Sequence, residues 1–213
     1  MTGISYIIFA FVIGCVFGYA ASRRRTYSFQ NSGEVLVSGV IRDNFSPPDF
    51  HLLNHITLAV EDGTTQIDHI LVSRFGVFVI ETKDYSGWIF ANAKHKNWTQ
   101  VFFHLKFKFQ NPIHQNFRHV RAVQKLLDFL PPSAVKSIVV FAGDAEFKTD
   151  VPPGVYSVSE LVEYLRACAQ EEVMSLNRVQ FCVGRLETAR LAISEKTDVE
   201  HVESLEHRYR DSD

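Results

Sequence analysis

Residues 66–84 read QIDHILVSRFGVFVIETKD, and this stretch predicts two β-strands joined by a tight turn at Phe75-Gly76. The run Val77–Ile80 is apolar at every position, which is typical of a strand that is covered on both faces. Such a strand does not usually end in charge, yet charged residues follow it at once: Glu81, Lys83 and Asp84. Because open α/β sheets bind ligands at the ends of their strands, these charges indicate a functional site.

Counting outward from the turn places three charged side chains on one face of the predicted hairpin. Glu81 and Lys83 are two positions apart, so a strand presents them on the same side. A two-residue turn at Phe75-Gly76 also places Asp68 opposite Lys83, and cross-strand partners share a face. A three-residue turn would flip one strand and separate the three side chains.

Two carboxylates beside an ammonium group are suited to metal-dependent hydrolysis of phosphodiester bonds. Carboxylate oxygens are hard ligands for Mg²⁺ or Mn²⁺, so Asp68 and Glu81 are the candidate metal ligands. A metal ion polarises the phosphate and lowers the pKa of a bound water. Lys83 would orient that water or offset the charge that grows on the phosphate. The alternative is that the three side chains form a surface ion-pair cluster, which contributes little.

The surrounding motifs give the chain a resemblance to a known family. It resembles the nuclease-related domain (NERD) family, within the PD-(D/E)xK restriction-endonuclease-like superfamily, over residues 33 to about 125. The residues that carry the resemblance are Gly33-Glu34, Gln66-Ile67-Asp68-His69, Gly76-Val77-Phe78-Val79-Ile80-Glu81-Thr82-Lys83, Gly87, Trp98, Asn111-Pro112 and Gln115. One departure from the superfamily is Ile67, which stands where many members have proline, and NERD-type sequences share this change.

The resemblance implies an α/β (α+β) fold with a restriction-endonuclease-like core of helix, antiparallel three-stranded meander, helix and strand. It also implies nuclease chemistry that depends on Mg²⁺ or Mn²⁺. Glu34 corresponds to the acidic residue of the first core helix, and Gln115 to the glutamine of the helix that follows the E-x-K strand. The candidate catalytic residues are therefore Glu34, Asp68, Glu81, Lys83 and Gln115, with Asp68 and Glu81 as metal ligands.

Three positions near these residues leave alternatives open. Glu34 falls in the first turn of a predicted helix, where a glutamate also stabilises the helix dipole. His119 lies on a helix predicted over 111–130 and would either act as a general acid or lie unused on the surface. His69 alternates away from the charged face of its strand, so we expect it to pack beneath the sheet.

Charge is unevenly distributed along the chain. The net charge of −2 gives no overall sign of a polyanionic partner, but the segment 85–127 holds seven Lys or Arg residues and no acid. A basic segment directly after the candidate metal site predicts nucleic-acid binding, with DNA favoured over RNA. The expected contacts are Lys94, Lys96, Lys106, Lys108, Arg118 and Arg121. The alternative is a basic surface that only faces solvent.

The N-terminal residues predict a membrane anchor. Ile4–Ala21 is apolar, and its length suits one transmembrane helix. Three arginines follow at 23–25, so the positive-inside rule places the N-terminus outside and the domain in the cytoplasm, in a single-pass protein of the inner or plasma membrane. Gly14 and Gly18 form a G-x-x-x-G motif, which permits close helix pairing and a homodimer. A cleaved signal peptide is the alternative, but the charges stand on the wrong side of the apolar run.

The chain divides into four segments. Residues 1–25 are the predicted anchor with its basic flank, and 26–32 are a polar linker. Residues 33–194 are the nuclease-like domain, and 195–213 are a charged tail with too few apolar residues to form a core, so we expect a frayed helix or disorder there.

Apolar periodicity and turn residues predict the elements within the domain. Strands are expected at 56–61, 64–73, 77–84, 101–109 and 136–142. Helices are expected at 33–42, 111–130, 160–170 and 171–194.

The sequence therefore predicts a membrane-anchored nuclease that needs a divalent metal ion. The alternative is a catalytically silent, membrane-tethered module that binds nucleic acid or acts as a scaffold. Binding by such a module would need no metal and would persist when Asp68 is replaced, whereas a nuclease would lose its activity.

Overall fold

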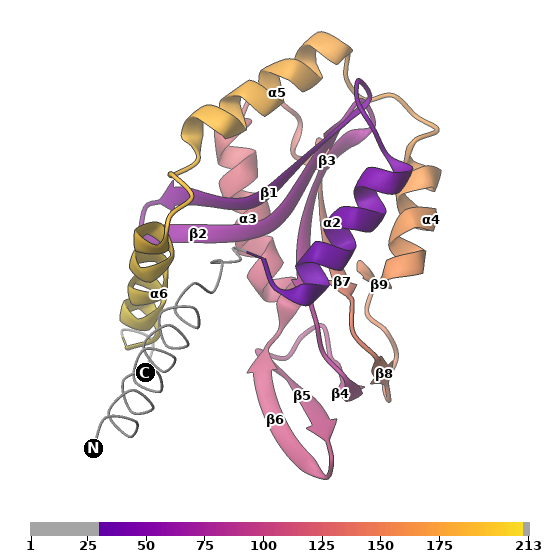
Figure 1. The fold of residues 1–213 in the computed structure, drawn as a ribbon, viewed down its shortest axis with the longest axis vertical. Helices are drawn as coiled ribbons and strands as arrows, with labels where there is room; N and C mark the ends of the chain where they lie inside the picture. Colours follow the sequence, from indigo (N-terminus) through magenta and orange to yellow (C-terminus); the bar gives the residue numbers. More distant parts are fainter. Residues whose placement is uncertain (1–29, 211–213) are drawn as a thin grey trace, which may run out of the picture.

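The computed structural model describes residues 30–210, and no helix in this part of the chain is long and apolar enough to cross a membrane. The predicted transmembrane helix at 4–21, with Gly14 and Gly18, lies outside the described residues, as does most of the predicted linker. The described part contains two β-sheets, with helices on both faces of the larger one (Figure 1).

The larger sheet has five strands in the order β1-β2-β3-β7-β9. As the sequence predicts, the first three form an antiparallel meander, and β7 and β9 extend the sheet parallel to β3. The strands are β1 Phe50–Val60, β2 Gly63–Ser73, β3 Gly76–Lys83, β7 Val135–Phe141 and β9 Val155–Ser157. A helix, α3, lies in the connection between β3 and β7, because parallel neighbours need a crossover of this kind.

Helices cover both faces of this sheet and enclose two apolar cores. The pair α2 and α4 packs on one face, and the pair α3 and α5 packs on the other. The bounds are α2 Ser32–Asn44, α3 Pro112–Leu126, α4 Val158–Cys168 and α5 Leu176–Ala189. Alternate residues of β3 face the two cores: Phe78 and Ile80 lie toward α2, and Val77 and Val79 toward α3. All four are fully buried, which confirms a strand covered on both sides.

The turn between β2 and β3 differs from the predicted one. Ser73 pairs with Gly76, so Arg74 and Phe75 form the two-residue turn, one residue earlier than Phe75-Gly76. Gly76, the first residue after the turn, has a φ of +136°, a conformation that glycine adopts readily and side chains disfavour. Every cross-strand partner is shifted by two residues, an even number, so the predicted faces of the strands are unchanged.

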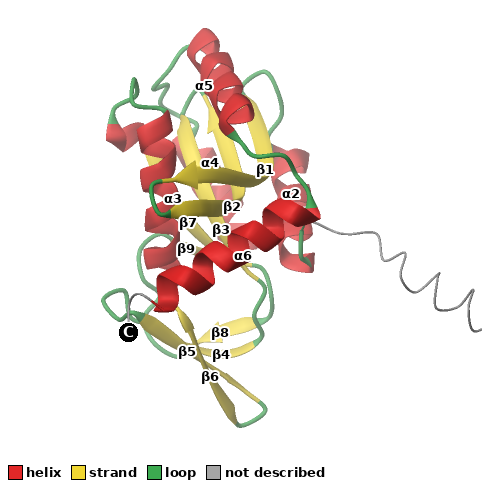
Figure 2. Cartoon of the chain, turned by 90° about the vertical axis from the view of Figure 1, so that its left-hand side faces the viewer, coloured by secondary structure: helices red, strands yellow, loops and turns green. Residues whose placement is uncertain are grey.

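A second, smaller sheet extends from the ends of β3 and α3, in the order β6-β5-β4-β8 (Figures 1 and 2). Its strands are β4 Gly87–Phe90, β5 Asn97–Phe102, β6 Leu105–Gln110 and β8 Ala145–Phe147. The stretch 101–109, predicted as one strand, is instead part of a hairpin. Phe103 and His104 have φ angles of 45° and 68°, and they form the turn that reverses the chain between β5 and β6. Trp98 is 1% exposed and stacks on Phe141 of β7, which anchors this sheet to the larger one.

Asparagine caps begin the two helices that start beside the ends of the sheet. Asn31 Oδ1 accepts a hydrogen bond from the backbone N–H of Glu34 at 3.0 Å, and Asn111 Oδ1 accepts from that of Ile113 at 3.0 Å. The Asn111 amide also donates to backbone carbonyl oxygens in the loop 92–95, so the cap fixes the start of α3 against the smaller sheet. The helix α3 ends four residues before its predicted end.

The tail at 195–213, for which the sequence predicts a frayed helix or disorder, contains a helix, α6 (Glu195–Arg210), which packs on the larger sheet. Figure 2 shows α6 lying across the edge of the larger sheet near β1 and β2. Its sequence is strongly charged, so apolar periodicity gave no sign of a packed helix.

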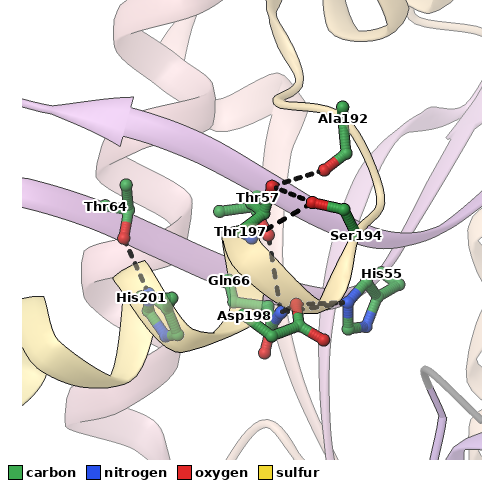
Figure 3. Close-up of polar contacts among 9 residues, drawn as sticks. All are labelled: His55, Thr57, Thr64, Gln66, Ala192, Ser194, Thr197, Asp198 and His201. Carbon is green, nitrogen blue, oxygen red and sulfur yellow. Dashed lines mark hydrogen bonds and ion pairs between the residues drawn. The ribbon is translucent and has the colours of Figure 1, made fainter. Parts of the chain in front are cut away.

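Polar side chains hold α6 on the sheet, as Figure 3 shows. Asp198 Oδ1 lies 3.0 Å from His55 Nε2 and accepts a hydrogen bond from Gln66 Nε2 at 2.9 Å. His201 Nδ1 lies 2.9 Å from Thr64 Oγ1. Because each contact joins α6 to β1 or β2, the helix is docked by hydrogen bonds rather than by a wide apolar stripe.

Candidate active site

Lys83 is the last residue of β3, and its side chain is held between two elements. Lys83 Nζ donates to Glu81 Oε1 at 2.6 Å and to Gln115 Oε1 at 3.1 Å. Gln115 lies near the N-terminus of α3, which begins at the same edge of the sheet where β3 ends. The structure thus brings three of the predicted residues, Glu81, Lys83 and Gln115, into direct contact.

Asp68 reaches the same place from β2. Its Oδ2 accepts a hydrogen bond from the backbone N–H of Thr82 at 2.7 Å. Burial, followed by the neighbouring carboxylates of Glu81 and Glu34, raises the pKa of Asp68 well above its ordinary value. Carboxylates raise one another's pKa only when they are close, so these three acids are clustered.

Glu34 approaches from the N-terminus of α2. Asn31 Nδ2 donates to Glu34 Oε1 at 2.5 Å, which fixes the carboxylate beside the cap. Burial raises the pKa of Glu34, although the bond to Asn31 acts in the opposite direction. Gly33 allows α2 to come this close, because a Cβ on Gly33 would stand 2.7 Å from the Cβ of Asp84.

Glu81 and Lys83 stabilise each other's charge. Glu81 is 2% exposed, and burial alone would raise its pKa, but Lys83 and His119 outweigh burial and hold the pKa below its ordinary value. Burial likewise opposes the charge on Lys83, but Glu81 and Asp68 more than reverse this effect and raise the pKa of the ammonium. Lys83 therefore keeps its proton at neutral pH and acts as a hydrogen-bond donor.

His119 belongs to this cluster, although the sequence left its role open. It is 5% exposed, with Nε2 3.2 Å from Glu81 Oε2 and Nδ1 2.7 Å from Thr65 Oγ1. Gln115 and His119 are four positions apart and share one face of α3, which is the signal that the sequence offered. One oxygen of Glu81 accepts a hydrogen bond from Lys83, whereas the other lies near His119 Nε2 without forming a hydrogen bond, so among the described residues it is a buried oxygen left without a hydrogen-bond donor.

His69 packs within the fold, as its alternation in the strand predicts. It is fully buried, and its Nδ1 lies 2.9 Å from Asn54 Oδ1. Burial lowers the pKa of His69 to about 4, so the ring is neutral at pH 7.

The predicted nucleic-acid contacts fall into two groups, and all six residues are exposed. Four lie on the smaller sheet and its loop, and two lie on α3. The first group is Lys94, Lys96, Lys106 and Lys108, and the second is Arg118 and Arg121.

The α3 group lines a groove of about 1030 Å³ between the β1–β2 turn, α3 and α5. Arg118 and Arg121 of α3 line this groove together with Glu61 and Asp62 of the β1–β2 turn. None of the candidate catalytic side chains lines this groove, although Thr65, the partner of His119, does. The groove therefore adjoins the acidic cluster without containing it.

The donor set fits a hard divalent cation. Three carboxyl groups, from Glu34, Asp68 and Glu81, interact electrostatically with one another and with the Lys83 ammonium, and burial together with the neighbouring acids raises the pKa of Asp68 and of Glu34, an effect that a bound cation would counteract. In the part of the chain that the structure describes, no three His, Cys, Asp or Glu side chains are arranged to hold a metal ion by themselves. Mg²⁺ is usually bound through one or two carboxylates, with waters and substrate phosphates as its other ligands, so Asp68 and Glu81 suit such a site.

Comparisons with known proteins point to one family. The nuclease-related domain family matches residues 30–142, just over half of the chain. An uncharacterized protein of Bacillus anthracis is 44% identical over 98 residues, which are 46% of this chain and 46% of that relative. The chain thus spans about half the length of this curated relative, and no solved structure matches it. By the extent of the family match, the chain belongs to the nuclease-related domain family, within the restriction-endonuclease-like superfamily.

Proposed function

We propose that this protein is a metal-dependent nuclease that hydrolyses phosphodiester bonds in DNA or RNA. A nuclease-like function and an interaction with nucleic acid follow from the family. The observation that carries the rest is the meeting of Asp68, Glu81 and Lys83 at the end of β3, where all three residues of the superfamily motif are present.

Asp68 and Glu81 would hold Mg²⁺ or Mn²⁺, with Glu34 assisting directly or through a water. When bound, the ion would polarise the scissile phosphate and lower the pKa of the attacking water. The buried oxygens of Asp68 and Glu81 are hard donors, which supports the choice of ion.

The other side chains position the reacting groups and stabilise charge. Lys83, in its charged form, offers hydrogen bonds to phosphate oxygens, on which negative charge grows in the transition state. Gln115 accepts a hydrogen bond from Lys83 Nζ and so limits the positions that the ammonium can take. His119 Nε2 lies 3.2 Å from the second oxygen of Glu81, where it would help to orient that carboxylate. We therefore treat Gln115 and His119 as positioning residues.

Cleavage of plasmid DNA and of an RNA transcript by the full chain, with Mg²⁺ compared with EDTA, tests this proposal. We expect cleavage only with the metal. Asp68→Asn and Lys83→Ala should each reduce the rate by roughly a hundredfold or more, because one lost electrostatic donor typically costs that much. Lys196→Ala, which changes an exposed lysine on α6, is the matched control and should keep the wild-type rate.

The outcomes separate the proposal from its alternatives. Equal cleavage by all variants would assign the activity to another site or to a contaminant. Metal-independent binding that persists in Asp68→Asn, with no cleavage by the wild type, would instead favour a silent binding module.

We also propose that the domain is anchored in the inner or plasma membrane by residues 4–21. The apolar run and the arginines at 23–25 support this, with the domain on the cytoplasmic side. The protein should stay in the membrane fraction after carbonate washing, and replacing the apolar run with a soluble tag should release it. Release of the unaltered protein by carbonate would contradict the anchor.

A further inference from the structure

The outer face of the smaller sheet carries aromatic side chains where a solvent-facing sheet usually carries polar ones. Trp88 and Phe90 of β4 are 49% and 40% exposed, while Ile89 between them is fully buried. Because Trp88 and Phe90 are two positions apart, they share one face of the strand. Grouped exposed aromatics on a folded protein usually mark an interaction surface.

The strand register adds two lysines to this face. Two rows of cross-strand partners run from β4 through β5 to β6, and each row begins with an aromatic residue and ends with a lysine. The rows are Trp88–Val101–Lys106 and Phe90–Thr99–Lys108. Cross-strand partners share a face, so each lysine lies two strands away from an aromatic ring, about 10 Å across the sheet.

The charge of this face is positive. Lys106 and Lys108 are exposed, and neither forms an ion pair with another residue in the part of the chain that the structure describes. Glu146 of β8 extends the first row, but Lys148 neutralises it, and the Lys148 ammonium lies 4.8 Å from the centre of the Trp88 ring. The face therefore suits an anionic partner that also offers flat apolar groups.

The smaller sheet is attached at both ends to the elements of the candidate active site. The strand β4 begins four residues after Lys83, and β6 leads through the cap residue Asn111 into α3, which carries Gln115. Figure 1 shows this sheet extending from the edge where β3 ends and α3 begins. A chain-like partner on the sheet would therefore lie next to the elements that carry Lys83 and Gln115.

We infer that the stacking face, defined as Trp88, Phe90, Lys106 and Lys108, binds single-stranded nucleic acid. The two rings stack on unpaired bases, and the two lysines contact the phosphates of the same strand. This inference rests on the proposed function and narrows its substrate class to DNA or RNA with unpaired bases. A duplex keeps its bases stacked inside the helix, where these rings cannot reach them.

Tryptophan fluorescence can report directly on ligand binding at the stacking face. The chain has two tryptophans, and Trp98 is 1% exposed, so changes caused by a ligand at the surface report on Trp88. The full chain carrying Lys83→Ala would be titrated in EDTA with oligo(dT), and separately with the same oligonucleotide annealed to oligo(dA). We expect quenching by the single strand, and at least tenfold weaker binding of the duplex.

Substitutions locate the binding. Trp88→Ala and Phe90→Ala should each weaken the binding of labelled oligo(dT) by roughly tenfold, as measured by anisotropy, because one base–aromatic stack contributes about this much. Trp88→Phe should keep most of the affinity. Lys106→Ala and Lys108→Ala should each lower the slope of log affinity against log salt by about 0.7. Phe181→Ala on α5, where the ring is 54% exposed, is the matched control and should change nothing.

Three results would overturn the inference: unchanged binding in Trp88→Ala and Phe90→Ala, equal binding of duplex and single strand, or quenching by phosphatidylglycerol vesicles but not by oligo(dT). The last result would make the face a membrane-binding surface. Binding is measured without metal or turnover, so these results are independent of cleavage. A wild type that binds as expected but cleaves nothing would contradict the proposed function and leave the inference standing.

Discussion

Among single residues, Asp68 has the most unfavourable electrostatic surroundings. Burial and two neighbouring carboxylates disfavour its charged form, and the backbone N–H of Thr82 and the Lys83 ammonium offset this only in part. Sites that bind cations often have this property, because the ion later supplies the missing positive charge. The negative charge of Asp68 is therefore expected to destabilise the fold when no cation is bound.

The first prediction is that Asp68→Asn stabilises the metal-free protein. Asparagine resembles the protonated acid and keeps an oxygen that accepts from Thr82. We expect the melting temperature in EDTA to rise by a few degrees, since about 1 kcal/mol corresponds to about 2–4 °C at this chain length. With Mg²⁺ the wild type should have the higher melting temperature of the two proteins, because only the wild type gains stability by binding the ion.

The stability gained by Asp68→Asn in the metal-free protein should depend on pH. The pKa of Asp68 is raised in the folded state, so the stability linked to its proton is complete below the unfolded pKa and is lost as the pH rises through the folded value. The variant should thus match the wild type in acid and exceed it at higher pH. Asp128→Asn, an exposed acid at the end of α3, is the control. A lower melting temperature for Asp68→Asn at every pH would contradict the electrostatic argument.

The second prediction concerns His119. Replacing it with asparagine should lower the cleavage rate by about tenfold to a hundredfold, which is typical for a residue that orients a metal ligand. The Mg²⁺ concentration needed for half-maximal cleavage should also rise, because Glu81 loses the contact to its second oxygen. Thr65→Val removes only the hydrogen bond at His119 Nδ1, on the side of the ring away from Glu81, and should have a smaller effect on the cleavage rate. An unchanged Mg²⁺ requirement in His119→Asn would show that the contact does not orient Glu81.

The sequence could predict the charged residues of the candidate site but not all of the contacts that these residues make. Asp68, Glu81 and Lys83 could be predicted because the alternation of side chains along the two strands of the hairpin places all three on one face. His119 was not, because its spacing from Gln115 shows a shared helix face but not that the face is buried against Glu81. Burial of that face depends on how α3 packs on the sheet, which no local pattern specifies.

At the scale of elements, the N-terminus of α2 depends on one glycine. Gly33→Ala would place a Cβ 2.7 Å from that of Asp84, and the helix would have to move, taking Glu34 with it. We predict reduced cleavage and a lower melting temperature. Gly39→Ala in the same helix has no atom within 4 Å of the new Cβ and should raise stability by up to about 1 kcal/mol, because alanine favours helix more than glycine does. Equal behaviour of the two variants would contradict this packing.

The fourth prediction is that polar contacts hold α6. Asp198→Ala should reduce stability by about 1–2 kcal/mol, since it removes a partly buried acceptor from Gln66. Hydrogen exchange along α6 should become faster. Glu200→Ala changes an exposed acid of the same helix and should stay within about 0.5 kcal/mol of the wild type. Unchanged exchange in Asp198→Ala would show that other contacts dock the helix.

The elements that the sequence predicted well are those with strong local signals. The strand β3 has an unbroken apolar run, and α2 and α3 have asparagine caps. The hairpin within 101–109 had no such signal, because Phe103 and His104 turn the chain without glycine or proline. The packing of α6 could not be predicted, because its partners, Thr64 and Gln66, lie more than 130 residues away in the sequence.

At the scale of the whole molecule, the two apolar cores on the faces of the larger sheet hold the end of β3 and the starts of α2 and α3 at one edge of that sheet. The smaller sheet extends from the same edge. The larger sheet follows from the meander and the crossover helix. The smaller one could not be predicted in full, because β8 has only three residues and pairs with β4 across more than fifty positions of sequence. The basic segment 85–127 nevertheless predicts that nucleic acid binds on the side of the molecule formed by the smaller sheet and α3.

In the proposed site, Asp68 and Glu81 share one divalent ion. The most direct test is a crystal of the full chain grown with Mn²⁺, with diffraction recorded at the manganese absorption edge. The account predicts one anomalous peak in contact with both carboxylates, and its loss in Asp68→Asn. A peak elsewhere with none at this pair, or the same peak in Asp68→Asn, would contradict it.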